Sequence, residues 1–251
     1  MKKASSLIFG IGITAILIIT GCAKKEDVNT DNPAAPATVT TPSIAIKDSY
    51  GTLVAVRSVS YTMVGGFTIP VEVNTAVAAF PSAPGSTTLL DAGTVTINSK
   101  GLTKQNNNAY VYQNLTSPLD FSDIIWNVSG SGAIPAISYT DNKPIPDYSG
   151  YTDLPASLTR SAGLEINLAG KITGADSVYV IIADVNSKYL LRRLGGGASK
   201  CSFTPADLAT LSAGTGMLQV VPWNYDKEDF SDKPFYFVIE SVYTKSGVTI
   251  N

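Results

Sequence analysis

The chain has 251 residues, 44% of them hydrophobic, and a formal net charge of −2. This hydrophobic content is ample for a core, and the near balance of 18 basic and 20 acidic residues argues against nucleic acid as a partner. The sequence contains no histidine, which excludes Ser-His-Asp and Cys-His catalysis and every zinc site that needs a histidine ligand.

The first segment with a recognisable role is the apolar run Leu7–Cys22, which follows the basic residues Lys2 and Lys3. The uncharged stretch over residues 4–20 is at the short end for a membrane span. Basic residues before such a run and small residues after it are typical of a signal peptide, with an uncleaved N-terminal anchor as the alternative. Either way, we expect the rest of the chain to be exported and attached to a membrane.

The apolar run ends at Ile19-Thr20-Gly21-Cys22, which resembles the lipobox of bacterial lipoproteins. The resemblance implies that residues 1–21 are removed and that Cys22 carries acyl chains such as palmitate, which bind the membrane. The following charged residues, Lys24–Asp27, resemble a signal for display on the outer face of the outer membrane; a solvated charge run is the alternative. We therefore expect an outer-membrane lipoprotein that is exposed on the cell surface.

With lipid on Cys22, the second cysteine, Cys201, has no disulfide partner. Cys201 shares its strand parity with Phe203, which predicts a small buried strand residue. One free thiol builds no thiolate metal site, so we assign no metal ligand and predict no cofactor. An oxygen-ligated ion such as calcium stays open.

The remaining chain divides by composition. Residues 22–43 are charged and then rich in Asn, Pro, Ala and Thr, which predicts a disordered tether. From Leu53 the apolar residues alternate, most clearly over Phe67–Val77, and we predict a β-sandwich over residues 44–142. Pro70 cannot donate to a strand ladder, which predicts an edge strand or a bulge at that point.

Residues 143–153 are rich in proline and predict a linker between two domains. In residues 154–251 we predict seven strands and one short helix, with Thr204 as N-cap and Pro205 at the first helical position. This strand order resembles an immunoglobulin-like sandwich, although the Cys…Trp…Cys hallmark is absent. The predicted fold is thus all-β: two β-sandwich domains, the second immunoglobulin-like with one short helix.

The most function-like stretch is Trp223–Asp232, which places four carboxylates and three aromatic rings between two apolar strands. We expect it to be a loop at one end of a sandwich, where binding loops lie. Flat rings beside acids suit sugar stacking and hydroxyl binding; the alternative is a solvated hairpin loop with Trp223 and Phe230 at the edge of the core. The predicted ligand-binding residues are Trp223, Tyr225, Asp226, Glu228, Asp229 and Phe230.

These features favour a non-enzymatic surface lipoprotein that binds a glycan or another surface protein. Some fimbrial subunits are lipoproteins with two β-sandwiches that lose an N-terminal strand by cleavage after an arginine. Because Arg57 is the first arginine after Cys22, a fimbrial-type structural subunit is one alternative. A glycan-active enzyme subunit is the other, but its carboxylate pair needs a separation that sequence alone does not give, and we assign no catalytic residue.

Overall fold

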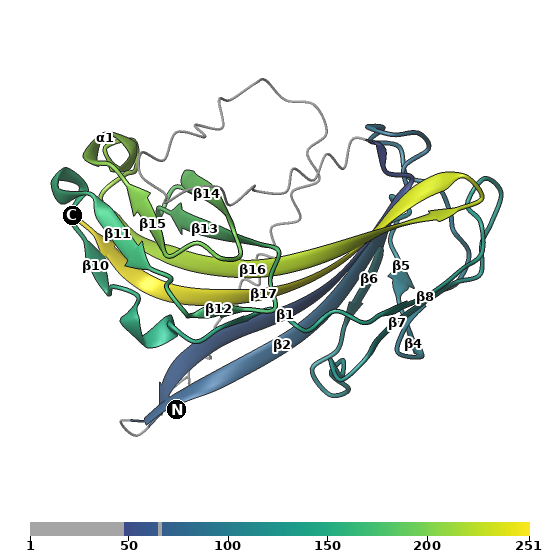
Figure 1. Cartoon of the computed structure of the whole chain (residues 1–251), viewed down its shortest axis with the longest axis horizontal. Helices are drawn as coiled ribbons and strands as arrows, with labels where there is room; N and C mark the ends of the chain where they lie inside the picture. The colour runs from purple at the N-terminus through teal and green to yellow at the C-terminus, as the bar shows by residue number, and fades with distance from the viewer. Residues whose placement is uncertain (1–47, 65–66) are drawn as a thin grey trace, which may run out of the picture.

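The computed structural model describes residues 48–64 and 67–251, so the lipobox, Cys22 and the predicted tether lie outside the described residues. The fold is all-β, as predicted. Nine strands form one main sheet in the order β14, β13, β16, β17, β1, β2, β6, β5, with β10 also paired to β17 (Figure 1). Their bounds are β1 (Gly51–Val64), β2 (Phe67–Ala79), β5 (Thr103–Lys104), β6 (Tyr110–Gln113), β10 (Ser157–Leu158), β13 (Ser177–Ala183), β14 (Tyr189–Gly195), β16 (Gly214–Phe230) and β17 (Lys233–Ile250).

Two smaller groups of elements cover the main sheet, one at each end of its long strands (Figure 1). The first group is a four-stranded sheet of β3 (Val95–Ile97), β4 (Lys100–Gly101), β7 (Ile124–Val128) and β8 (Ile137–Asp141). The second contains the pairs β11–β15 and β12–β9 with three short helices. Its bounds are β9 (Asp147–Tyr148), β11 (Leu164–Asn167), β12 (Ile172–Thr173), β15 (Lys200–Phe203), η2 (Tyr151–Asp153), η3 (Arg160–Ala162) and α1 (Pro205–Leu208).

Each covering group closes a hydrophobic core over the same face of the main sheet. The first core joins Leu53 of β1 and Phe237 of β17 to Trp126 of β7. The second core joins Val59 of β1 to Phe203 of β15 and their buried neighbours. Side chains two residues apart in a strand share a face, so Leu53 and Val59 lie on one face, which we call the covered face.

The two halves of the sequence share the main sheet. β1 pairs with β17 in parallel, from Gly51 opposite Phe235 to Ser60 opposite Thr244. The expected division into two sandwiches at residues 143–153, and the immunoglobulin-like character of the second, are therefore not confirmed. Residues 143–153 instead contain β9 and η2 and pass between the covering groups.

Arg57 lies between the two cores on the covered face, which explains why it interrupts the apolar alternation of β1. Its Nη2 donates to Asp147 Oδ1 at 2.5 Å and to the Tyr243 hydroxyl at 2.7 Å, and its Nε donates to Ser241 Oγ at 3.2 Å. Asp147 follows the proline-rich segment, so this network attaches the crossing between the covering groups to the main sheet.

Three local predictions are confirmed. β6 pairs with β2 only over Thr75–Ala78, so Pro70 lies where β2 is an edge strand. Thr204 caps α1 in a reciprocal capping box with Asp207. Cys201 is a buried free thiol in β15, where burial raises its pKa to about 12.

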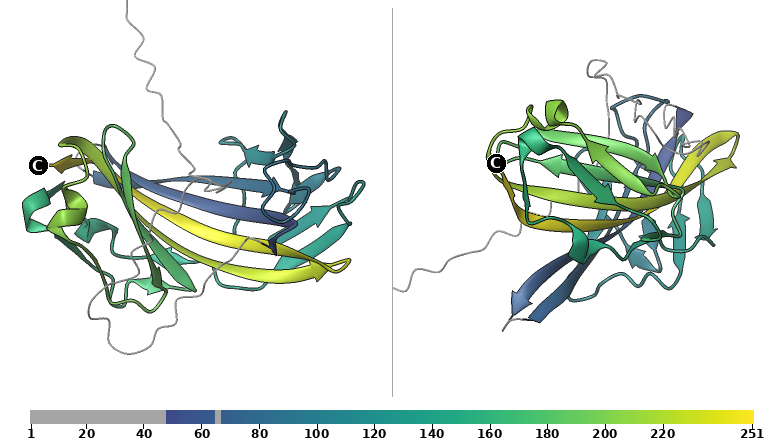
Figure 2. Two further views of the ribbon diagram at one scale, coloured as in Figure 1. Left: turned by 90° about the horizontal axis from the view of Figure 1, so that it is seen from above. Right: turned by 60° about the vertical axis from the view of Figure 1, so that its left-hand side comes forward.

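The two long hairpins end at opposite extremities of the molecule (Figures 1 and 2). The β16–β17 hairpin ends beside the first covering group, and the β1–β2 hairpin projects beyond the sheet near the second. No helix within the described ranges is long and apolar enough to cross a bilayer.

Candidate functional site

The stretch Trp223–Asp232 is a continuous hairpin, so the expectation of a loop is wrong. β16 runs through Phe230, and Phe230 pairs directly with Lys233 of β17. The turn consists of Ser231 and Asp232, both with positive φ (53° and 59°), as in the two-residue turns whose twist matches paired strands. The polar and aromatic residues of this stretch form a strand because the neighbouring strand β17 hydrogen-bonds to their backbone groups.

Strand geometry separates the six predicted binding residues. Trp223 and Tyr225 lie on the face opposite the two cores, which we call the second face. Asp226 and Phe230 lie on the covered face, because alternate residues of a strand point to opposite sides. The six side chains therefore do not converge on one ligand.

Two of the three predicted aromatic rings pack inside the protein. Trp223 is only 2% exposed. Phe230 packs edge-to-face on Phe235 and Phe237, with ring centroids 5.8 and 6.2 Å apart, and so belongs to the margin of the first core. Tyr225 is half-buried.

Asp226 is held in a polar cluster at the edge of β16. It accepts a hydrogen bond from the Tyr139 hydroxyl at 2.7 Å and lies 3.2 Å from Lys143 Nζ. Lys143 also donates to Asp176 at 3.0 Å and to the Tyr225 carbonyl at 2.6 Å. Burial alone would lower the pKa of Lys143, but its bonds to Asp176 and Asp226 raise it overall, so the ammonium stays charged. The cluster is internally satisfied and fixes the proline-rich crossing to β16.

An aromatic row crosses the second face. The ring centroids of Tyr179 and Trp223 are 5.3 Å apart, those of Trp223 and Tyr225 are 5.8 Å apart, and those of Tyr225 and Tyr236 are 6.0 Å apart. Arg193 and two lysines lie over these rings; the guanidinium carbon of Arg193 is 5.2 Å from the Trp223 centroid. Tyr179 and Tyr236 were not identified from the sequence, because they come from other strands and only the sheet register brings them beside Trp223.

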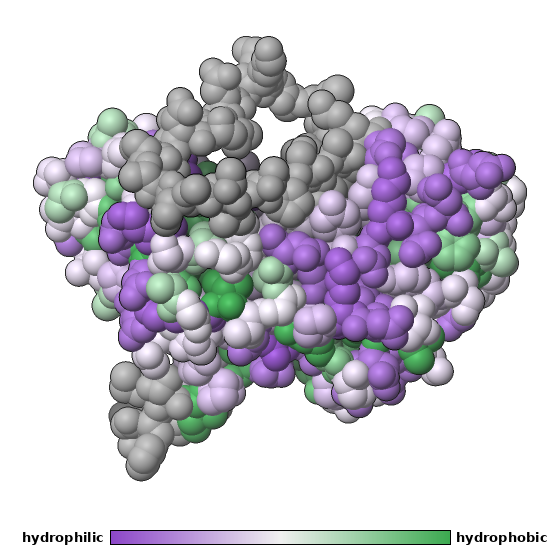
Figure 3. All heavy atoms as spheres, in the orientation of Figure 1, coloured by the Kyte–Doolittle hydropathy of each residue, from purple (hydrophilic) through white to green (hydrophobic). Residues whose placement is uncertain are grey.

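The exposed part of the hairpin is acidic. Glu228, Asp229 and Asp232 are all exposed around the turn, and we call them the acidic tip. The space-filling view shows hydrophilic side chains at the right-hand extremity, where this hairpin ends (Figure 3). Among the described residues none of these three carboxylates bonds to a basic side chain, because the lysines of the hairpin, Lys227 and Lys233, bond to Asp48 and to the Ala133 carbonyl. The tip therefore presents acidic groups to the solvent.

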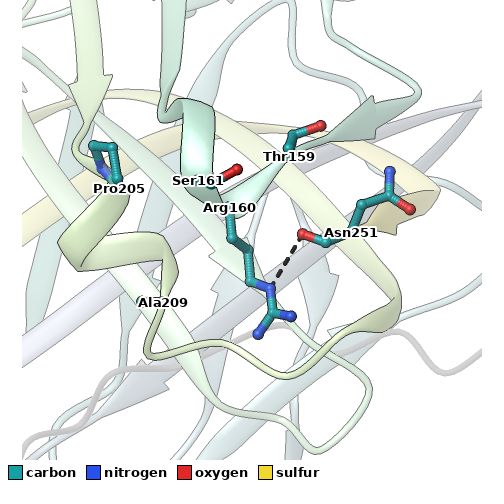
Figure 4. Close-up of a pocket in the computed structure, with 6 residues that line it drawn as sticks. All are labelled: Thr159, Arg160, Ser161, Pro205, Ala209 and Asn251. Carbon is teal, nitrogen blue, oxygen red and sulfur yellow. Dashed lines mark hydrogen bonds between the residues drawn. The ribbon is translucent and has the colours of Figure 1, made fainter.

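A depression lies elsewhere, between η3, α1 and the end of β17, and is lined by Thr159, Arg160, Ser161, Pro205, Ala209 and Asn251 (Figure 4). Arg160 donates from Nε to the Asn251 carbonyl at 3.1 Å and from Nη1 to the Leu211 carbonyl at 2.9 Å. These two bonds connect η3 to the C-terminal residue and to the segment after α1, so the Arg160 guanidinium has a structural role. Across the described ranges, no three acidic or cysteine side chains gather in an arrangement that would hold a metal ion.

Arg57, the residue on which the fimbrial alternative depends, is deeply engaged in the sheet. Its backbone is paired with Ser241 on one side and Asn74 on the other, and its side chain is bound as described above. Cleavage after Arg57 would therefore require prior opening of a central strand.

Comparison with known proteins does not assign this chain to a family. The chain matches no protein-family model, and no curated protein is significantly similar to it.

Proposed function

We propose that this chain is a non-enzymatic binding module, anchored to the outer membrane through lipid on Cys22 and exposed on the cell surface. The lipobox-like ending Ile19–Cys22 and the charged residues that follow it support the anchor. The binding role is supported by the acidic tip, which the long β16–β17 hairpin carries at the extremity of the molecule.

The acidic tip is held in a defined position, and this observation carries the proposal. Phe230, directly before the turn, packs on the rings of Phe235 and Phe237 in the first core. Paired strands and a buried anchor limit the motion of the tip, so a partner binds it with little loss of conformational entropy.

Between the two ligand classes, the geometry favours a protein over a glycan. Sugar stacking needs accessible ring faces, but Trp223 is buried and Phe230 is packed in the core. Exposed carboxylates attract a basic protein surface and speed its association. Asp48, at the beginning of the described chain, bonds to Lys227 near the tip. A protein with a basic surface is the best fit to this site.

Neutralisation of the acidic tip tests the proposal. We would replace Glu228 with Gln and Asp229 and Asp232 with Asn, and cross-link intact cells that display the lipoprotein. The expected result is loss of a discrete cross-linked partner, and weakening of the wild-type complex by salt. Glu72→Gln, an exposed acid on β2, is the matched control and should retain the partner. An unchanged cross-link in the triple variant would exclude the tip as the contact.

A fimbrial-type structural subunit is the second candidate, and one observation favours it. Ile69 and Val71 are 43% and 41% exposed on the projecting β1–β2 hairpin. There β2 pairs with β1 on one side, but among the described residues no strand pairs with its other side before Thr75. An unpaired edge with exposed apolar side chains is a template for pairing with another chain. Electron microscopy of cells that express the protein distinguishes the two roles: filaments support the subunit, and their absence together with tip-dependent cross-linking supports the binding module.

A further inference from the structure

The outer edge of β2 has a stretch without a partner strand. β1 pairs with one side of β2 along its whole length. On the other side, β6 pairs with β2 only from Thr75 onward, and the Asn74 side chain donates to the Leu119 carbonyl at 2.9 Å. Within the ranges that the structure describes, no strand pairs with this side over residues 67–73, which we call the free edge. It belongs to the hairpin that projects beyond the sheet, so another molecule can reach it (Figures 1 and 2).

Apolar side chains are exposed along the free edge. Glu72 lies opposite Val59 of the covered face, so the odd-numbered residues of β2 point to the second face. Two of them, Ile69 and Val71, are 43% and 41% exposed. The β1 residues opposite these two are exposed and carry hydroxyl groups: Thr62 and Ser60. A layer over the hairpin would meet these hydroxyl groups, whereas a strand beside β2 contacts the apolar side chains directly. The distribution therefore favours pairing at the edge.

The free edge is complementary to itself about Pro70, its central residue. When two copies pair antiparallel about this point, Ile69 of each copy lies opposite Val71 of the other, so apolar side chains meet on one face. Pro70 has no N–H to donate, but it lies opposite Pro70 of the other copy. Every other residue of the free edge then faces a residue with both a donor and an acceptor. Glu72 lies opposite Thr68, so the two Glu72 carboxylates do not face each other.

Neighbouring antiparallel registers are less favourable. A register centred on Val71 places Pro70 opposite Glu72, which loses a donor, and it pairs fewer residues because β6 occupies the edge from Thr75 onward. A register centred on Glu72 brings two carboxylates face to face, which is destabilising. Proline and charged residues at a sheet edge generally prevent indiscriminate pairing. At the free edge they leave one register in which two copies fit, so a second copy of this chain is the partner that this edge matches.

We propose that two copies of this chain form a dimer by antiparallel pairing of their free edges about Pro70. The main sheet of one copy then continues into that of the other. Because both copies use the same edge, the contact closes at two copies, whereas the subunits of a filament join through two different surfaces. The β16–β17 hairpin ends at the opposite extremity of the molecule, so the dimer carries one acidic tip at each far end. The contact is short, and we expect a reversible dimer.

Analytical ultracentrifugation over a range of concentrations tests the dimer. We would use the whole chain from residue 22, with Cys22→Ser to keep it soluble, and expect a monomer–dimer equilibrium. Val71→Lys should weaken the dimer about tenfold or more, because it replaces both contacts between Ile69 and Val71 with a charge beside an apolar side chain. Ile125→Lys is the matched control, since Ile125 is 38% exposed on β7, and it should leave the equilibrium unchanged.

A disulfide measurement tests the register and does not depend on the lysine variants. On mild oxidation, chains with Ile69→Cys mixed with chains with Val71→Cys should form a disulfide between copies, because the register brings the two Cβ atoms to about 5 Å. Ile125→Cys chains mixed with Val71→Cys chains are the control, and Cys201 is buried in all of them.

A monomer at every concentration would overturn the proposal, as would filaments or a disulfide yield no higher than in the control. Neutralisation of the acidic tip should leave the dimer intact, and Val71→Lys should leave the tip-dependent cross-link intact. The dimer and the proposed binding function are therefore tested separately.

Discussion

The two faces of the main sheet are formed by the same strands, but the covering groups pack on only one of them. On the covered face, side chains such as Phe237 and Val220 pack against the two covering groups. The strands of these groups are paired with one another, so their backbone groups are satisfied. On the second face, equally buried side chains such as Val221 and Trp223 lie beside polar atoms that have no partner. Unpaired buried polar atoms also occur on the covered face, at Asn74 Oδ1 and Asn224 Oδ1, so the two faces differ in what packs on them and not in how completely their polar atoms are paired.

The largest expected difference between the faces comes from the two tryptophans. Trp126→Ala should lower the free energy of unfolding by about 3–5 kcal/mol, because it leaves a cavity in a core that is closed on all sides. Trp223→Ala should cost less, roughly 2 kcal/mol, since the half-buried side chains around it, Tyr179, Tyr225 and Arg193, relax into the space more easily than a closed core does. Urea unfolding of both variants measures the difference. Equal losses would mean that the second face is as rigidly covered as the first.

Glu240 gives the second face a pH dependence. It lies opposite Trp223, and burial raises its pKa to about 7. Because the folded pKa is above the unfolded one, the folded state holds the proton more tightly, and stability is highest below about pH 4.3 with respect to this group. It then falls as the pH rises through about 7, by at most about 4 kcal/mol at ~1.4 kcal/mol per pKa unit. Urea unfolding between pH 4 and 8 should show this slope in the wild type.

The matched variant is Glu240→Gln, which cannot ionise and should remove that slope while leaving the fold intact. If the slope persists in Glu240→Gln, another group is its source.

The smallest expected effect concerns the junction between the cores on the covered face. Asp147→Ala leaves the Arg57 guanidinium without its carboxylate, but Asp147 is 49% exposed, so we expect a loss of only about 1 kcal/mol. Lys200→Ala removes a more exposed pair with Glu165 and should cost less than about 0.5 kcal/mol. Thermal unfolding of both variants checks the order. The reverse order would show that the Arg57 network does not connect the cores.

Local patterns in the sequence were sufficient to predict features that are determined by residues within one strand or helix. The alternation over Phe67–Val77 predicted β2, and Pro70 predicted its edge, because side-chain period and a missing donor are properties of one strand. Thr204 and Pro205 predicted the start of α1 for the same reason. The burial of Cys201 followed from its parity with Phe203.

The predictions that failed depend on contacts between distant residues. Trp223–Phe230 has the composition of a loop, and it is a strand because β17 pairs with it along its whole length. Pairing of β1 with β17 joins residues 184 positions apart, as in the bond from Arg57 to Ser241, and no local pattern encodes it. For the same reason the sequence indicated acids and rings in one stretch but not that the sheet separates them onto two faces.

The central position of β1 has a mechanical consequence for a protein held by its N-terminal segment. Tension on that segment acts along β1, which has ten paired residues with β17 and thirteen with β2. With the load taken up at the far end of the sheet, the hydrogen bonds on both sides of β1 lie across the direction of pull and share it in shear. They would have to break together, whereas a strand peeled from an edge loses its bonds one at a time. A lipid anchor of the kind proposed for Cys22 would therefore pull on a strand that resists extraction by force.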